Sequence, residues 1–218
     1  MFQPALDLIR REYSGLAAKE YVAQISRYHR IQASPGYRQA ATWVADELAR
    51  WGLEVAVHRY PARFDQFYWS AGMFQEWDCQ AATLHLVAPA DKAQKLCDFR
   101  EVPISVVQRS IAADGEYEVV AVQGGTQRED YDGLSVSGKL VLTGAAVEAV
   151  RKVAVEELGA VGVLFDGMTP APPTRQPGDL QDVRQYTSWW WTGHETRCFG
   201  FVLTPRQGAW LRGLLKQG

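Results

Sequence analysis

Two short apolar runs joined by a helical stretch stand out in the second half of the chain. They are residues 138–143 (GKLVLT) and residues 158–165 (LGAVGVLF), and between them Val147, Val150, Ala154 and Leu158 recur at helical spacing. Gly159 and Gly162 permit a sharp entry into the second run and a close approach to its neighbours. The stretch therefore predicts two neighbouring buried strands, with the helix between them as the crossover that packs on their face.

The elements expected on either side of this stretch divide the chain into an α-rich and a β-rich part. Expected helices are residues 4–12, 16–31, 37–51, 145–158 and 205–216, and expected strands are residues 53–60, 82–87, 116–122, 139–143, 161–165 and 199–203. Ser34 is a good N-cap with Pro35 at the first helical position, and Gly52 is a good C-terminal stop. Residues 166–196 read as a long Pro-rich loop.

The change of character predicts an α+β protein with two domains. The first, residues 1–62, is a helical segment with one strand. The second, residues 63–218, is mostly β, although residues 63–114 lack a clear period and leave its start poorly assigned.

Composition and charge exclude several classes of protein. The 218 residues carry 23 Lys and Arg against 25 Asp and Glu, and 47% are hydrophobic, close to an average globular protein. Disordered, collagen-like and coiled-coil chains are therefore excluded. A net charge of -2 with scattered basic residues argues against a nucleic-acid or anionic-membrane partner, because both require a basic surface.

The cysteines and the N-terminus predict a cytoplasmic protein. Cys79, Cys97 and Cys198 cannot all pair within one chain, so a reducing compartment fits best. The first dozen residues contain charges and no apolar core of a signal peptide, and no run of apolar residues is long enough to span a membrane.

Residues 133–139 (GLSVSGK) match the spacing of a phosphate-binding loop, but their context does not fit. A phosphate-binding loop opens a helix and carries Ser or Thr after the lysine, whereas here Leu140 follows and the next residues read as a strand. The same strand argues against Ser135 as the nucleophile of a serine hydrolase. We interpret the segment as a tight turn that leads into a strand.

A second pattern with possible chemistry is His194-Glu195-Thr-Arg-Cys198, which is similar to the start of a zinc-protease helix with cysteine at the last ligand position. It follows Gly193 and leads into the predicted strand at residues 199–203, so His194 and Cys198 would not share a helical face. The default interpretation is an exposed loop histidine and a buried cysteine.

Three of the eight tryptophans, Trp189, Trp190 and Trp191, are consecutive. Neighbouring side chains of an extended segment point to opposite sides, so at least one of the three should face solvent unless something covers it. The sequence leaves two interpretations open: a contact surface for a peptide or a partner, or a loop with all three rings packed on its own domain.

These residues together resemble two known families. Residues 132–143, the helix after them and residues 158–165 resemble a protease-associated domain, whose signature is a "GKIVL" strand, a helix and a "GAxGVI" turn; residues 201–211 resemble its last strand and "G..L" helix. Residues 28–36 and 51–55 resemble the opening of the di-zinc aminopeptidases of peptidase family M28, which often carry this domain as an insertion. The resemblance implies a β-barrel or sandwich with flanking helices for the second domain.

The zinc ligands of that family are not matched in this sequence. The family has a His-x-Asp pair, but the residues two positions after the four histidines are Ile31, Tyr60, Val87 and Thr196. Glu156-Glu157 is superficially similar to the family's catalytic glutamate pair, but Val163 replaces the serine of that segment, and the glutamates are more simply the solvated face of a helix. We therefore assign no catalytic and no metal-binding residue and expect no cofactor in this chain, with zinc expected only in a missing catalytic domain.

The resemblance implies a non-catalytic role: the front portion of a zinc aminopeptidase-like protein, which shapes substrate access or binds a peptide or protein partner through Trp189, Trp190 and Trp191. The alternatives are a free-standing metal-dependent hydrolase with a site near His194 and Cys198, or a stand-alone peptide-binding module. In the family, residues 53–60 would pack on a catalytic sheet. Here their apolar side chains should be covered by the β-rich part or by a second copy in a homo-oligomer, or be partly disordered.

Overall fold

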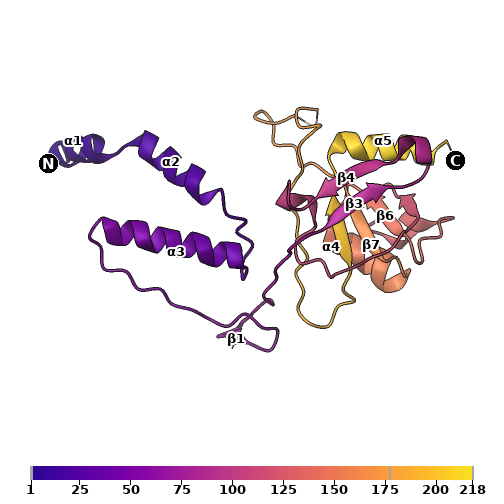
Figure 1. The fold of residues 1–218 in the computed structure, drawn as a ribbon, viewed down its shortest axis with the longest axis horizontal. Helices are drawn as coiled ribbons and strands as arrows, with labels where there is room; N and C mark the ends of the chain where they lie inside the picture. Colours follow the sequence, from indigo (N-terminus) through magenta and orange to yellow (C-terminus); the bar gives the residue numbers. More distant parts are fainter. Residues whose placement is uncertain (1, 177, 218) are drawn as a thin grey trace. The chain divides into compact units, whose positions relative to one another are not determined.

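The chain divides into two units, Met1–Pro61 and Ala62–Gly218. The structure is a computed structural model that describes residues 2–176 and 178–217. It confirms a mixed α+β fold, in which helices make up the first unit and the sheets lie in the second (Figure 1). Within these residues, no helix is both long enough and apolar enough to cross a membrane.

The first unit consists of α1 (Gln3–Glu12), α2 (Gly15–Ile25) and α3 (Pro35–Arg50). The predicted start of α3 is confirmed, since the Ser34 hydroxyl accepts a hydrogen bond from the Tyr37 amide at 3.2 Å and Pro35 follows it. Tyr21 of α2 packs against Trp43 and Trp51, with ring centroids 6.1 and 5.3 Å apart. The two longer helices are therefore held together by aromatic contacts.

Two sequence predictions in this unit are wrong. The second helix ends at Ile25 instead of residue 31, and residues 26–34 turn back so closely that the carbonyl oxygen of His29 lies 2.2 Å from where a Cβ on Gly36 would be. Residues 53–60 form no strand, and Leu53, Val55 and Val57 are exposed. Alternation alone does not make a strand, because a strand needs a partner for its backbone hydrogen bonds.

The second unit contains three sheets. A parallel sheet has the order β5 (Val119–Ala121), β6 (Leu140–Thr143), β7 (Gly162–Phe165) and β8 (Phe199–Val202). Two antiparallel pairs accompany it: β1 (Phe67–Tyr68) with β2 (Ala71–Gly72), and β3 (Thr83–Leu86) with β4 (Gln94–Asp98). The helical elements are α4 (Val147–Val150), the π-helix η4 (Arg151–Glu157), α5 (Pro205–Leu215) and the 3-10 turns η1 (Ala90–Lys92), η2 (Pro103–Ser105) and η3 (Arg128–Tyr131).

The parallel sheet is buried on both faces, as its apolar runs predict. On one face Val141, Val163 and Val202 pack with the buried side chains of α4 and η4. On the other face Leu142, Leu164 and Phe201 pack with β3, β4 and α5, which contribute Leu84, Leu86, Leu96 and Leu211. The strand–helix–strand prediction is confirmed, because β6 and β7 are parallel neighbours and α4 with η4 connects them (Figure 1).

Gly208 allows α5 to lie close to the loop after β7. A Cβ at position 208 would lie 1.9 Å from Oδ2 of Asp166, whose carboxylate accepts two hydrogen bonds from Arg212 of the same helix. We expect Gly208→Ala to lower the free energy of unfolding by about 1–3 kcal/mol, since the added methyl group displaces that ion pair. Urea unfolding of the purified chain measures the change.

Gly213 is the matched control in the same helix. A Cβ there would have no atom within 4 Å. Gly213→Ala should therefore raise the free energy of unfolding by up to about 1 kcal/mol through helix propensity alone. Equal effects of the two alanines would contradict the close contact between α5 and Asp166.

Candidate functional site

The three consecutive tryptophans lie in the loop before β8, and only one of them faces solvent. Trp189 is 0% exposed and Trp191 is 6% exposed, whereas Trp190 is 48% exposed. The alternation predicted for an extended segment is thus present. Because Trp189 and Trp191 lie in the core of the second unit, Trp190 is the member of the triplet that a partner could contact. We call residues 186–198 the Trp loop.

Trp189 and Trp191 pack together on residues 109 and 110. Their rings are stacked with centroids 5.5 Å apart. The indole N–H of Trp189 donates to Oγ of Ser110 at 3.3 Å, and that of Trp191 donates to the carbonyl oxygen of Arg109 at 2.6 Å. Both buried polar groups therefore have partners, as a stable aromatic core requires.

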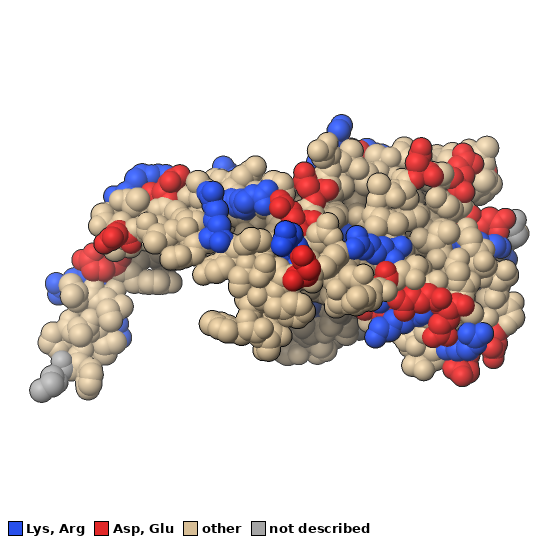
Figure 2. All heavy atoms as spheres, turned by 90° about the horizontal axis from the view of Figure 1, so that it is seen from below, with Lys and Arg blue, Asp and Glu red and all other residues tan. Residues whose placement is uncertain are grey.

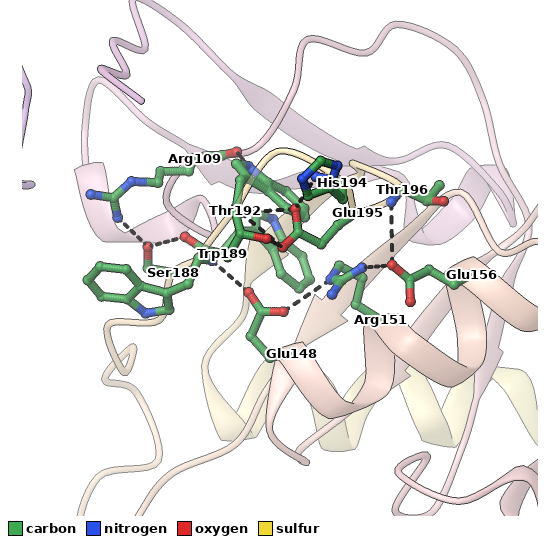
Figure 3. A network of polar contacts seen from close by, with 12 residues as sticks. Arg109, Glu148, Arg151, Glu156, Ser188, Trp189, Thr192, His194, Glu195 and Thr196 are labelled. Atoms are coloured by element: carbon green, nitrogen blue, oxygen red, sulfur yellow. Dashed lines mark hydrogen bonds and ion pairs between the residues drawn. The ribbon is translucent and has the colours of Figure 1, made fainter. Parts of the chain in front are cut away.

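Arg151 at the start of η4 connects the Trp loop to the helix (Figure 3). Its side chain is 3% exposed and pairs with the carboxylates of Glu148 and Glu156, and its guanidinium carbon lies 5.5 Å from the centroid of the Trp191 ring. The same carboxylates accept loop amides: Glu148 from Trp190 at 2.6 Å and Glu156 from Thr196 at 3.4 Å. Arg151 and its two partners thus hold the loop at two points.

The π-helix explains how Arg151 reaches both glutamates. Glu148 is three residues before Arg151, a normal spacing for a helical ion pair. Glu156 is five residues after it, a spacing that would separate the two side chains on an α-helix. In η4 the backbone hydrogen bonds join residues five apart, as in the 3.1 Å bond from the Leu158 amide to the Val153 carbonyl. Side chains five residues apart therefore lie on the same side of this helix, which brings Arg151 next to Glu156.

The electrostatics of this cluster favour a fixed charge. Burial by itself lowers the pKa of Arg151, but the hydrogen bonds with Glu156 and Glu148 outweigh it and raise the pKa. Arg151 therefore stays charged, and both carboxylates are used in holding it. Such a buried cation with two partners makes a rigid support for the loop.

Glu195 holds the tip of the loop. Its carboxylate accepts hydrogen bonds from the amides of Thr192, Gly193 and His194 at 2.9–3.2 Å, and another from the Thr192 hydroxyl. Partial burial by itself raises the pKa of Glu195, but these bonds lower it to about 2. The turn is therefore held by a charged carboxylate at neutral pH, and the stability that this carboxylate contributes is lost progressively as the pH falls from 4.5 to about 2.

Trp190 has a cation beneath its ring. The guanidinium carbon of Arg109 lies 4.8 Å from the centroid of the Trp190 ring and 4.7 Å from that of Phe74, and the two rings meet edge to face. Arg109 is 2% exposed and donates to the Ser188 hydroxyl at 2.9 Å. The half-exposed indole is therefore fixed in place before any partner arrives, which lowers the entropic cost of binding.

The histidine and cysteine of the zinc-like pattern lie in different environments. His194 is exposed on the loop, whereas Cys198 is 1% exposed, and burial raises its pKa to about 12. A thiol binds zinc as a thiolate, so a Cys198 with this pKa is a poor ligand at neutral pH. Among residues 2–176 and 178–217, no three His, Cys, Asp or Glu side chains are grouped so that they could hold a metal.

The other two motifs are structural in this fold. Residues 133–139 form a turn into β6, with positive φ at Gly133 and Gly138, and Lys139 pairs with Glu118 at 2.5 Å. Glu157 is paired with the exposed Arg128, and Glu156 with Arg151.

Sequence reasoning did not find Arg109, Arg151 and Glu148. For Arg151 a signal existed, because it is four residues after Val147 and three before Ala154, on the apolar face of the predicted helix. A charged residue on such a face indicates a buried ion pair. Arg109 gives no comparable signal, since residues 104–110 have no helical or strand period.

Comparisons with known proteins relate the fold to one family. No family model and no curated protein sequence matches the chain. The chain is similar to the crystal structure of a Peptidase M28 precursor from Shewanella amazonensis SB2B, with a TM-score of 0.52 and 14% sequence identity. The match covers 91% of this chain and 43% of that one.

The chain has an M28-related fold. A match over 91% of 218 residues includes residues of both units, so it is not confined to the parallel sheet. The chain spans less than half of the length of that peptidase precursor. At 14% identity the likeness concerns the fold and carries no residue roles.

Proposed function

We propose that this chain is the non-catalytic portion of a zinc aminopeptidase-like protein, and that its second unit is a protease-associated domain that selects peptide substrates or binds a protein partner. The observation that carries the proposal is the half-exposed Trp190, fixed on a loop that Glu195, Glu148 and Glu156 hold through hydrogen bonds to its amides. A fixed aromatic side chain of this kind is a typical anchor for a binding partner.

The hydrogen-bond partners of the glutamates and the raised pKa values of two cysteine thiols support a binding role. The glutamates of the Trp loop and η4 accept hydrogen bonds from amides or pair with arginines. The thiols of Cys97 and Cys198 are buried, and burial raises their pKa to about 11 and about 12. A nucleophilic thiol needs a pKa near the working pH, and the pKa values of these two thiols are far above it.

The first unit supports the proposal that a further domain belongs to the protein. Leu53, Val55 and Val57 are 54%, 36% and 55% exposed, so three alternating apolar side chains lack cover within this unit. In the proposal they pack on a catalytic sheet outside this chain, and zinc belongs to that sheet. A second copy of the chain is the other way to cover them.

Trp190→Ala tests the binding role. We expect it to weaken the binding of short peptides about tenfold or more, because a preorganised aromatic side chain is a typical hot spot. Binding is measured by calorimetry with a panel of tetrapeptides that differ at the first residue and have free amino termini.

Trp69→Ala is the control, since Trp69 is fully exposed and lies at the tip of the β1–β2 hairpin, outside the Trp loop. It should bind the same peptides as the unchanged protein. A Trp190→Ala variant that binds every peptide of the panel as tightly as the unchanged protein overturns the role of Trp190.

A further inference from the structure

A groove of about 490 Å³ lies in the second unit. Its lining comes from residues 77–84, Val106, residues 110–115, Tyr117 and the strands β6 and β8, and none of it belongs to residues 186–198. The inference below therefore does not depend on the proposed role of Trp190.

One wall of the groove includes a sheet edge. Ala82, Thr83 and Leu84 line the groove, and the last two belong to β3. Within the described ranges, β3 pairs with β4 on one side and with no strand on the other. An unpaired strand edge is a template to which an extended peptide can add.

A second segment of the lining offers backbone groups. It is formed by residues 110–115, and Ile111 donates its amide to the Cys198 carbonyl at 3.3 Å. No hydrogen bond found in the described part of the chain involves the backbone of Ala112 or Ala113. These N–H and C=O groups are therefore available to a ligand that replaces water.

The floor of the groove is apolar and partly aromatic. Tyr117 and Phe199 lie against each other with ring centroids 5.6 Å apart, and Leu140 and Phe201 complete the floor. Such a floor accepts the apolar side chains of a bound segment, since their burial contributes roughly 25 cal/mol per Å².

The charges at the groove have one sign. Asp78 and Asp114 are the only charged residues that line it, both are exposed, and no basic side chain is present in the lining. Figure 2 shows basic and acidic side chains interspersed over the face drawn there. The groove thus complements a positively charged ligand.

We propose that this groove binds an extended peptide segment with alternating apolar and basic side chains. In an extended segment alternate side chains point to opposite sides, so the apolar ones reach the floor while the basic ones reach Asp78 and Asp114 at the rim. The segment's backbone pairs with the edge of β3 and with residues 112–113. The ligand class is therefore a basic, apolar strand and not an acidic one.

Cys79 provides a probe in the unmodified protein. It lines the groove and is half-buried, whereas Cys97 and Cys198 are 2% and 1% exposed, so a thiol reagent reacts with Cys79 in the folded chain. Burial raises the pKa of the Cys79 thiol, so all rates are compared at one pH. For every form of the protein, the labelling rate of Cys79 is measured with and without peptide, and these two rates are compared.

The test uses the blocked peptides Val-Lys-Val-Lys-Val and Val-Glu-Val-Glu-Val. We expect the lysine peptide to slow the labelling of Cys79 by a factor of about three or more, because it covers the thiol, and the glutamate peptide to leave it unchanged. Replacing both Asp78 and Asp114 by Asn should weaken binding of the lysine peptide about two- to thirtyfold, as measured by calorimetry.

Asp132→Asn is the matched control, since Asp132 is an exposed aspartate outside the groove. It should bind the lysine peptide as the unchanged protein does. Labelling that neither peptide slows, or that both slow equally, overturns the proposal. So does a double Asn variant that binds the lysine peptide with undiminished affinity. Trp190→Ala should leave the protection of Cys79 intact, so the two binding proposals can fail separately.

Discussion

Replacing Arg151 by methionine should lower the free energy of unfolding of the second unit by about 3–5 kcal/mol, because it leaves two partly buried carboxylates without their cation. The Arg151 side chain is 3% exposed, while those of Glu148 and Glu156 are 32% exposed. The variant also removes the cation next to the Trp191 ring. Methionine keeps most of the volume of the arginine side chain, so the lost stability comes mainly from removing the charge and not from opening a cavity.

Arg128→Met is the matched control for this prediction. Arg128 of η3 pairs with Glu157 of η4, but the two side chains are 66% and 50% exposed, so the expected loss is about 0–1 kcal/mol. Pulsed alkylation of Cys198 in increasing urea measures both variants, since this thiol is buried in the core cluster that contains η4. If both variants lost the same free energy of unfolding, burial of Arg151 would not be what makes its ion pairs stabilising.

The parallel sheet was predictable because its signals are local. Residues 139–143 and 161–165 are short apolar runs with glycine at the turns, and each appears as a strand within one residue of the predicted bounds. The helix between them was equally clear. Sequence cannot show that it becomes a π-helix after Val150, because that change depends on where Arg151 and Glu156 meet.

The elements that sequence reasoning missed depend on distant partners. Residues 53–60 alternate as a strand does, yet the first unit provides no neighbouring strand for them. Conversely, β4 at Gln94–Asp98 has a weak pattern of its own and exists because β3 lies beside it. Strand propensity depends on packing against neighbours. The local pattern therefore predicts a strand at residues 53–60, where none forms, and misses the strand β4.

The candidate site shows the same division between local and distant signals. Alternation predicted that the three tryptophans would not all face one side, and Trp190 is the exposed one. Its supports come from residues 42 or more positions away: Phe74, Arg109 and Glu148. No spacing within the Trp loop could reveal them.

Trp189→Ala should cost about 3–5 kcal/mol of unfolding free energy in the second unit, the range for truncating a large buried aromatic side chain. Trp189 is 0% exposed, stacks on Trp191 and donates to Ser110. The Ser110 hydroxyl also accepts from the Gly200 amide in β8 at 3.0 Å, so the cavity would open beside the parallel sheet. The loss should therefore reach the sheet and not stay within the Trp loop.

Hydrogen exchange over residues 139–165 and 199–203, read by mass spectrometry, measures this loss. Trp190→Ala is the control in the same loop: it removes a half-exposed ring and a cation–π contact, so the expected cost is about 0.5–1 kcal/mol. The two substitutions are chemically identical and one residue apart. A similar loss of protection in both would mean that Trp189 and Trp190 pack alike, and the separation into a core ring and a binding ring would be wrong. A loss confined to Trp189→Ala supports that separation, because only then can Trp190 be changed to test binding without unfolding the loop that presents it.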